Sequence, residues 1–224
     1  MLEARGIDLS YGPTPALRDV SMKVSPGSSV ALMGASGSGK SSLLHCLAGV
    51  IIPDRGSVLV DDVDITGLTD RERSRLRLEQ MGVVFQFGDL VPELTLVENV
   101  MLPLQLLGTK HDEAKRRATA LLDTLGIADL AHARTGAVSG GQAQRGTVAR
   151  AMVHEPKIVL ADEPTGALDS VNAEAVLDAL VNLARDTGTS LLVVTHDNIV
   201  ASHLDILVTM HDGRVLTPTA GASK

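Results

Sequence analysis

One glycine-rich segment constrains the fold of this chain more than any other feature. Residues 34–42 read GASGSGKSS, follow the short apolar run SVALM at 29–33 and lead into the helical pattern SLLHCLAG. Strand, loop and helix in this order form the context in which GxxxxGK[ST] surrounds phosphate groups with backbone N–H donors at a helix N-terminus. The alternative is a glycine-rich turn that matches by chance, and the flanking strand and helix argue against it.

The predicted phosphate loop sets expectations for individual side chains. The Lys40 ammonium should neutralise β- and γ-phosphates, and the Ser41 hydroxyl should be a ligand of Mg²⁺. The residues expected to bind the nucleotide in this loop are Gly34, Ala35, Ser36, Gly37, Ser38, Gly39, Lys40, Ser41 and Ser42. A phosphate loop specifies a nucleoside triphosphate fold and leaves the task of the protein open.

Two acidic residues follow a second apolar strand, in the segment IVLADEP at 158–164. An acid at that strand end is expected beside the phosphate loop, where Asp162 can hold Mg²⁺ through its water shell and Glu163 can polarise the attacking water. Taken alone, the pair also fits a solvated turn between strand and loop.

A third segment, VSGGQ at 138–142, lies between the other two and opens a predicted helix. Ser139 and the N–H groups that follow it form a potential anion site at the helix start. By itself the pattern is explained as well by a helix cap with a flexible lead.

In this order and spacing, the three segments resemble those of the ABC ATPase family, and the resemblance extends over the whole chain. Val138 stands where that family usually has leucine. The resemblance implies an ATPase that binds ATP and Mg²⁺, and that works as a homodimer on separate transmembrane permease subunits. It further implies a set of residues that act in trans, on ATP held by the other subunit: Ser139, Gly140, Gly141, Gln142 and Asp169.

Four positions outside the phosphate loop match the family one at a time. Gln86, in VVFQFGDL, matches the glutamine that contacts Mg²⁺ and the attacking water, and His196, in LLVVTHD, matches the histidine that bonds the γ-phosphate. Asp169, in ALDS, matches the aspartate that crosses between subunits, and Tyr11, in LSYG, matches the aromatic residue that stacks on adenine. The alternatives are a surface amide, a polar strand end and a helix cap for the first three.

The pattern along the chain favours an α/β fold. Short apolar runs with turns cover residues 3–60, helical periodicity dominates about 88–155, and apolar strands alternate with helices after residue 157. We expect one ABC ATPase domain over residues 1–224. It would be a P-loop NTPase of the RecA-like type with a mainly parallel sheet, an N-terminal antiparallel β subdomain and an inserted helical subdomain at about 88–155.

Composition excludes several classes of protein. Hydrophobic residues make up 44% and charged residues 21% of the 224 positions, which excludes a disordered chain. A formal net charge of -7 argues against nucleic acid as a partner, and the single cysteine, Cys46, excludes an intramolecular disulfide. No apolar run reaches the roughly 18 to 20 residues that span a bilayer. The expected location is the cytoplasmic face of the cell membrane, peripheral through the permease.

Within the family, the stretch DLVPELTLVENVMLPL and the arginine-rich segment before VVFQ resemble the branch that serves lipoprotein release and macrolide efflux. That resemblance implies export of a hydrophobic or amphipathic substrate, such as a lipoprotein, a peptide, a drug or haem. The alternative is an ABC ATPase that drives mechanical signalling across the membrane without transport. The sequence leaves this alternative open, together with the substrate, the direction of transport and the identity of the permease.

Overall fold

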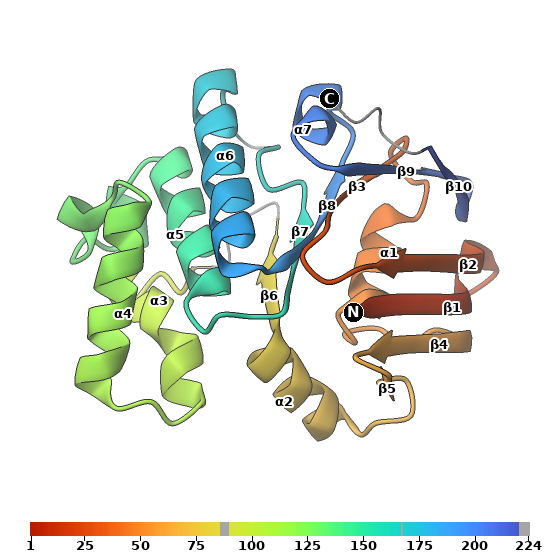
Figure 1. The fold of residues 1–224 in the computed structure, drawn as a ribbon, viewed down its shortest axis with the longest axis horizontal. Coiled ribbons are helices and arrows are strands. Elements are labelled where there is room, and N and C mark those ends of the chain that lie inside the picture. Colours follow the sequence, from red (N-terminus) through yellow and green to blue (C-terminus); the bar gives the residue numbers. More distant parts are fainter. Residues whose placement is uncertain (86–89, 167, 220–224) are drawn as a thin grey trace.

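Two sheets organise the chain, and a group of helices lies beside them (Figure 1). The computed structural model describes residues 1–85, 90–166 and 168–219. The first sheet is antiparallel and has the order β2-β1-β4-β5. Its strands are β1 (Leu2–Tyr11), β2 (Thr14–Val24), β4 (Arg55–Val60) and β5 (Val63–Asp64).

The second sheet forms the centre of the molecule and has the order β10-β9-β3-β8-β7-β6. Its strands are β3 (Ser29–Met33), β6 (Met81–Val84), β7 (Ile158–Asp162), β8 (Ser190–Thr195), β9 (Ile206–His211) and β10 (Arg214–Thr219). All neighbouring strands pair in parallel except β9 and β10. The mainly parallel α/β fold and the antiparallel N-terminal sheet are therefore as predicted.

The central sheet is buried on both faces, which explains its nearly continuous apolar strands. Along β8, Leu191 and Val193 belong to one hydrophobic core, whereas Leu192 and Val194 belong to the other. Successive side chains of a strand point to opposite faces, so one strand serves both cores. One core joins this sheet to the antiparallel sheet and α1 (Lys40–Leu47), and the other joins it to the helices.

The helices that pack on the second core gather on one side of the molecule, at the left in Figure 1. They are α3 (Leu96–Leu106), α4 (His111–Thr124), α5 (Gly140–Met152) and α6 (Ser170–Thr187), with short 3-10 turns at Ala128–Leu130 and Thr135–Ala137. Two capping boxes start these helices: Thr95 with Glu98 at α3, and Ser139 with Gln142 at α5.

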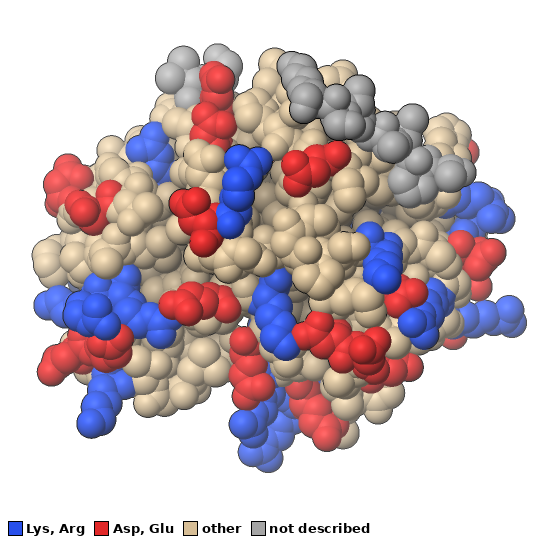
Figure 2. Space-filling view, viewed as in Figure 1, with Lys and Arg blue, Asp and Glu red and all other residues tan. Residues whose placement is uncertain are grey.

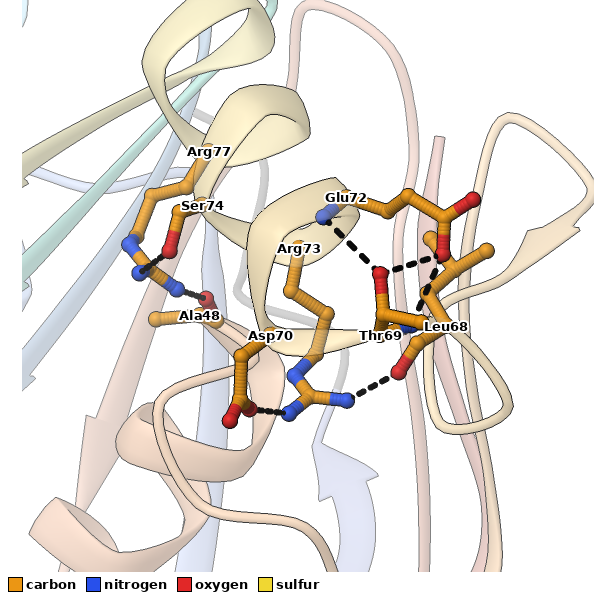
Figure 3. Close-up of polar contacts among 8 residues, drawn as sticks. All are labelled: Ala48, Leu68, Thr69, Asp70, Glu72, Arg73, Ser74 and Arg77. Carbon is orange, nitrogen blue, oxygen red and sulfur yellow. Dashed lines mark hydrogen bonds and ion pairs between the residues drawn. The ribbon is translucent and has the colours of Figure 1, made fainter.

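The arginine-rich segment forms α2 (Asp70–Gln80). Its alternating basic and acidic residues indicate a solvated helix face, and part of that interpretation is wrong (Figure 3). Arg75 is exposed and pairs with Glu79, as expected. Arg73, however, is only 7% exposed, and its guanidinium donates to the Leu68 carbonyl and to Asp70. Half-buried Arg77 donates to the Ala48 carbonyl oxygen at 3.0 Å. These two side chains join α2 to the preceding loop and to the end of α1.

The surface agrees with the mixed composition. Among the described residues on the face in Figure 2, basic and acidic side chains are interspersed. Of the helices in the described ranges, none combines the length and apolar character needed to cross a membrane.

Candidate active site

A cavity of about 750 Å³ lies at the carboxyl ends of the central strands. Because β3, β7 and β8 are parallel neighbours in register, the residues that follow them meet at one edge of the sheet. The cavity is lined by Tyr11, Thr14, Pro15, Ala16, Ala35, Ser36, Gly37, Gly39, Lys40, Ser41, Ser42, Asp162, Glu163 and His196. Four separate parts of the sequence thus form one site, and the predicted phosphate loop and acidic strand end are two of them.

The phosphate loop connects β3 to α1, so the α1 N-terminus faces the cavity. Lys40 is 8% exposed, and its ammonium donates to the carbonyl oxygens of Gly34 at 2.8 Å and Ala35 at 2.9 Å. These two bonds hold the charge inside the loop. Gly39 has φ 101°, and a Cβ there would lie 2.5 Å from the Ala16 carbonyl oxygen. This position therefore excludes every other residue type.

The two acids at the end of β7 differ in their surroundings. Burial raises the pKa of the Asp162 carboxyl, while a hydrogen bond with Ser41 opposes that shift. Oδ1 of Asp162 is buried and has no hydrogen-bond partner in the described part of the chain. A buried oxygen of this kind is costly unless a ligand satisfies it, so a cation beside Asp162 and Ser41 fits the site.

The Glu163 carboxylate makes contacts with the segment after β8. Nδ1 of His196 lies 2.6 Å from Glu163 Oε1, and the buried Thr195 hydroxyl donates to Oε2 at 3.4 Å. The Glu163 side chain is 15% exposed, whereas the His196 side chain is 69% exposed. The structure thus joins the predicted general base and the predicted phosphate-sensing histidine in one hydrogen-bonded pair at the cavity wall.

The oxygen-bearing side chains around the cavity suit Mg²⁺ that is bound together with phosphates. Within residues 1–85, 90–166 and 168–219, no cluster of three His, Cys, Asp or Glu side chains could hold a metal by itself. Mg²⁺ is commonly held by one or two protein ligands, phosphate oxygens and water. Ser41 and Asp162 are the described residues that would provide such ligands, and the metal would neutralise charge on the transferred phosphoryl group.

Tyr11 lines the cavity and is 52% exposed, with its hydroxyl 3.4 Å from the Ser42 hydroxyl. Three lining residues were not predicted: Thr14, Pro15 and Ala16. They begin β2, which pairs with β1 so that Thr14 lies opposite Tyr11 and Pro15 opposite Ser10. The Tyr-Gly-Pro turn that precedes them was the available signal, because a tight hairpin must bring the following residues beside the tyrosine.

The predicted trans-acting residues lie outside this cavity lining. Ser139 is exposed and caps α5, accepting a hydrogen bond from the Gln142 N–H at 3.3 Å. Asp169 caps α6 and accepts one from the Asn172 N–H at 3.1 Å. Gln86, the remaining predicted catalytic and metal-binding residue, lies outside the described residues.

Comparisons with known proteins agree with this architecture. A family model described as ABC transporter matches residues 17–166. The chain is 39% identical over 220 residues to the lipoprotein-releasing system ATP-binding protein LolD of Hyphomonas neptunium, with 96% of each chain covered. It is 38% identical over 221 residues to the ABC transporter ATP-binding protein YtrE of Bacillus subtilis, with 95% of this chain and 96% of that one covered.

Among solved structures, the dimeric post-hydrolysis state of the ATP-binding cassette MJ0796, bound to ADP and Pi, superimposes with a TM-score of 0.92. It is 34% identical in sequence, and the match covers 100% of both chains. The similarity therefore includes the whole cassette, with the antiparallel sheet and the helices as well as the central sheet.

Proposed function

Since this chain belongs to the ABC transporter family of ATPases, we propose that it hydrolyses ATP to drive a separate membrane permease that exports a hydrophobic or amphipathic substrate. The observation that best supports this proposal is that Lys40, Asp162 and Glu163 line one cavity, whereas Ser139 lies outside that lining. The 39% sequence identity to a lipoprotein-releasing ATP-binding protein supports a lipoprotein or lipid-like substrate. We further propose that residues 1–224 form one domain with a helical subdomain at about 88–155.

In this proposal, the following predicted site residues have defined roles. Lys40 neutralises the phosphates, Glu163 is the general base toward the attacking water, and His196 bonds the γ-phosphate. Ser41, Asp162 and Gln86 are assigned to Mg²⁺, and Tyr11 to adenine. Ser139, Gly140, Gly141, Gln142 and Asp169 act on the ATP of the partner subunit.

Isolation of the native complex tests the proposed partner and substrate. We expect the tagged chain, purified from membranes in mild detergent, to bring a polytopic permease with it, and the complex to carry a bound lipid-like molecule. Reconstitution should then show ATP-dependent release or movement of that molecule. A complex that couples ATP turnover to an enzyme outside the cell, with nothing transported, would replace the proposed export by mechanical signalling.

Tyr11→Ala should weaken the binding of every adenine nucleotide and spare the chemical step. Stacking on an aromatic side chain contributes about 1 to 3 kcal/mol, and the ring makes no contribution at the phosphates. Titration with ATP and ADP measures the affinity, and single-turnover hydrolysis at saturating ATP measures the chemical step.

Tyr11→Phe is the matched control because it keeps the ring and removes only the hydroxyl that lies near Ser42. It should bind ATP nearly as well as the parent chain. A slower chemical step in Tyr11→Ala at unchanged affinity would contradict the assignment to adenine.

A further inference from the structure

We propose that Asn172 is a positioning residue. It holds Asp169, at the start of α6, in a fixed position relative to the start of α5, so that residues of both helix starts can meet the ATP of the partner subunit. The inference rests on the proposed function, because it concerns how the trans-acting residues are presented. In this proposal, Asn172 itself contacts neither the nucleotide nor the partner subunit.

The first observation is the hydrogen bonding of the Asp169 carboxylate. Its Oδ1 accepts from the Asn172 backbone N–H at 3.1 Å, and its Oδ2 accepts from the Asn172 side-chain amide at 2.7 Å. The first bond is a helix N-cap, which any residue at 172 except proline can provide. The second depends on the asparagine amide and fixes the rotation of the carboxylate, because both of its oxygens are then held from one side.

The second observation is the contact between Asn172 and the first turn of α5. An ideal Cβ on Gly141 would lie 2.8 Å from Asn172 Oδ1 and 3.1 Å from Asn172 Cβ. The Asn172 side chain therefore occupies the space directly over the Gly141 backbone. A side chain at 141 would require the Asn172 side chain to move, so glycine at 141 is what allows Asn172 to lie this close to the α5 backbone.

Together these observations place Asn172 between the Asp169 carboxylate and the backbone of Gly141, two residues from Ser139. Ser139 caps α5 and Asp169 caps α6, so Asn172 connects the N-termini of these two helices. Residues that must meet one ligand lose much of their effect when displaced by about 1 Å. A side chain that fixes their relative position therefore contributes to the shared site without touching ATP.

The test compares Asn172→Ala with Asn182→Ala, a matched change at an exposed asparagine of the same helix. Both are made in the Glu163→Gln chain so that ATP persists, and sedimentation measures ATP-dependent pairing. We expect Asn172→Ala to raise the dissociation constant of the pair by about 10- to 100-fold, the scale of one hydrogen bond to a charged group. Asn182→Ala should leave that constant unchanged.

Two further measurements separate positioning from general stability. The ATP affinity of the single chain should match the parent value in Asn172→Ala, because the residues that line the cavity do not include Asn172. In a double-mutant cycle, Asp169→Ala and Asn172→Ala together should weaken pairing by less than the sum of their separate effects, since Asn172 acts in part through that carboxylate.

The inference is overturned if Asn172→Ala pairs as well as Asn182→Ala, if the two lesions add fully, or if affinity of the single chain falls together with pairing. Failure of the parent chain to pair at any ATP concentration would instead overturn the proposed shared site, and this inference with it.

Discussion

Glu163→Gln is expected to retain ATP binding and to lose ATP hydrolysis by about 10² to 10⁴ fold, the usual contribution of a general base. Glutamine keeps the size and the hydrogen-bonding shape of the side chain, but its amide cannot take a proton from water. The phosphate loop and Tyr11 are unaltered by the change. ATP affinity and the position of the bound nucleotide should therefore stay close to those of the parent chain.

The surroundings of Glu163 explain why it is preferred over its neighbours as the base. Its carboxylate lines the cavity, and the 2.6 Å contact with His196 Nδ1 together with the Thr195 hydroxyl fixes its direction. Asp162 precedes it in β7, and burial raises the pKa of that carboxyl. We assign Asp162 to Mg²⁺ because its buried Oδ1 has no hydrogen-bond partner in the described chain.

Two measurements and one control variant check this prediction. Equilibrium binding of labelled ATP should be unchanged, single-turnover hydrolysis should fall by the stated factor, and Glu113→Gln, at an α4 residue paired with Arg116, should leave both unaltered. Near-normal turnover by Glu163→Gln would move the base elsewhere, and His196, its hydrogen-bonded neighbour, would be the first candidate.

Much of the fold was predictable because its strongest signals are local. The strand that precedes the phosphate loop was predicted at 29–33, and β3 spans Ser29–Met33. The helix predicted to open at VSGGQ is α5, which spans Gly140–Met152. By contrast, β5 has two residues and α7 (Asn198–Ser202) has five, so neither is long enough to show a hydrophobic period.

What the sequence could not provide was the contact between distant segments. Arginines spaced along a polar helix look solvated, and the burial of Arg73 depends on the loop that ends in Leu68. Gly146 lies inside α5, where glycine costs roughly 1 kcal/mol relative to alanine. In the structure a Cβ there would lie 3.2 Å from Leu96 Cδ2, so glycine also permits the close approach of α5 to α3.

In the candidate site, too, local motifs were predictable from the sequence, whereas contacts between distant segments were not. The motifs predicted which residues of the phosphate loop and of β7 meet, because parallel strands bring their carboxyl ends to one edge. Thr14, Pro15 and Ala16 lack a motif and enter the cavity through hairpin pairing. Asn172 was missed for the same reason: its role is defined by Gly141, which lies on another helix.

Restoration of activity by mixing two inactive variants is the second large effect that we expect. Lys40→Ala removes the ammonium from the phosphate loop, and Ser139→Ala removes the cap at the start of α5. Each variant alone should have almost no ATPase activity, because every site of a uniform pair then carries its lesion. Lys40→Ala should also lose productive nucleotide binding, since phosphate charge in the loop is left uncompensated.

A mixed pair behaves differently if the site is shared. Lys40 lines the cavity of its own chain, whereas Ser139 lies outside that lining. In a twofold-symmetric pair, each α5 N-terminus can be placed over the opposite phosphate loop, where its N–H groups face the γ-phosphate. Both lesions of a mixed pair then fall in one site, and the other site keeps an intact Lys40 and an intact Ser139.

The experiment uses co-expressed chains with different tags, purified through both tags in turn, with the permease present to enforce pairing. We expect the mixed pair to recover up to about half of the parent ATPase rate, because one of two equivalent sites is intact. If each chain instead built a complete site of its own, every site in the mixture would carry one lesion and mixing would restore nothing. The shared site would be contradicted by a verified mixed pair that is no more active than either single variant and that does not retain ATP in an occlusion assay. The occlusion assay is needed because two strictly coupled sites could share residues and still fail to turn over when only one is intact.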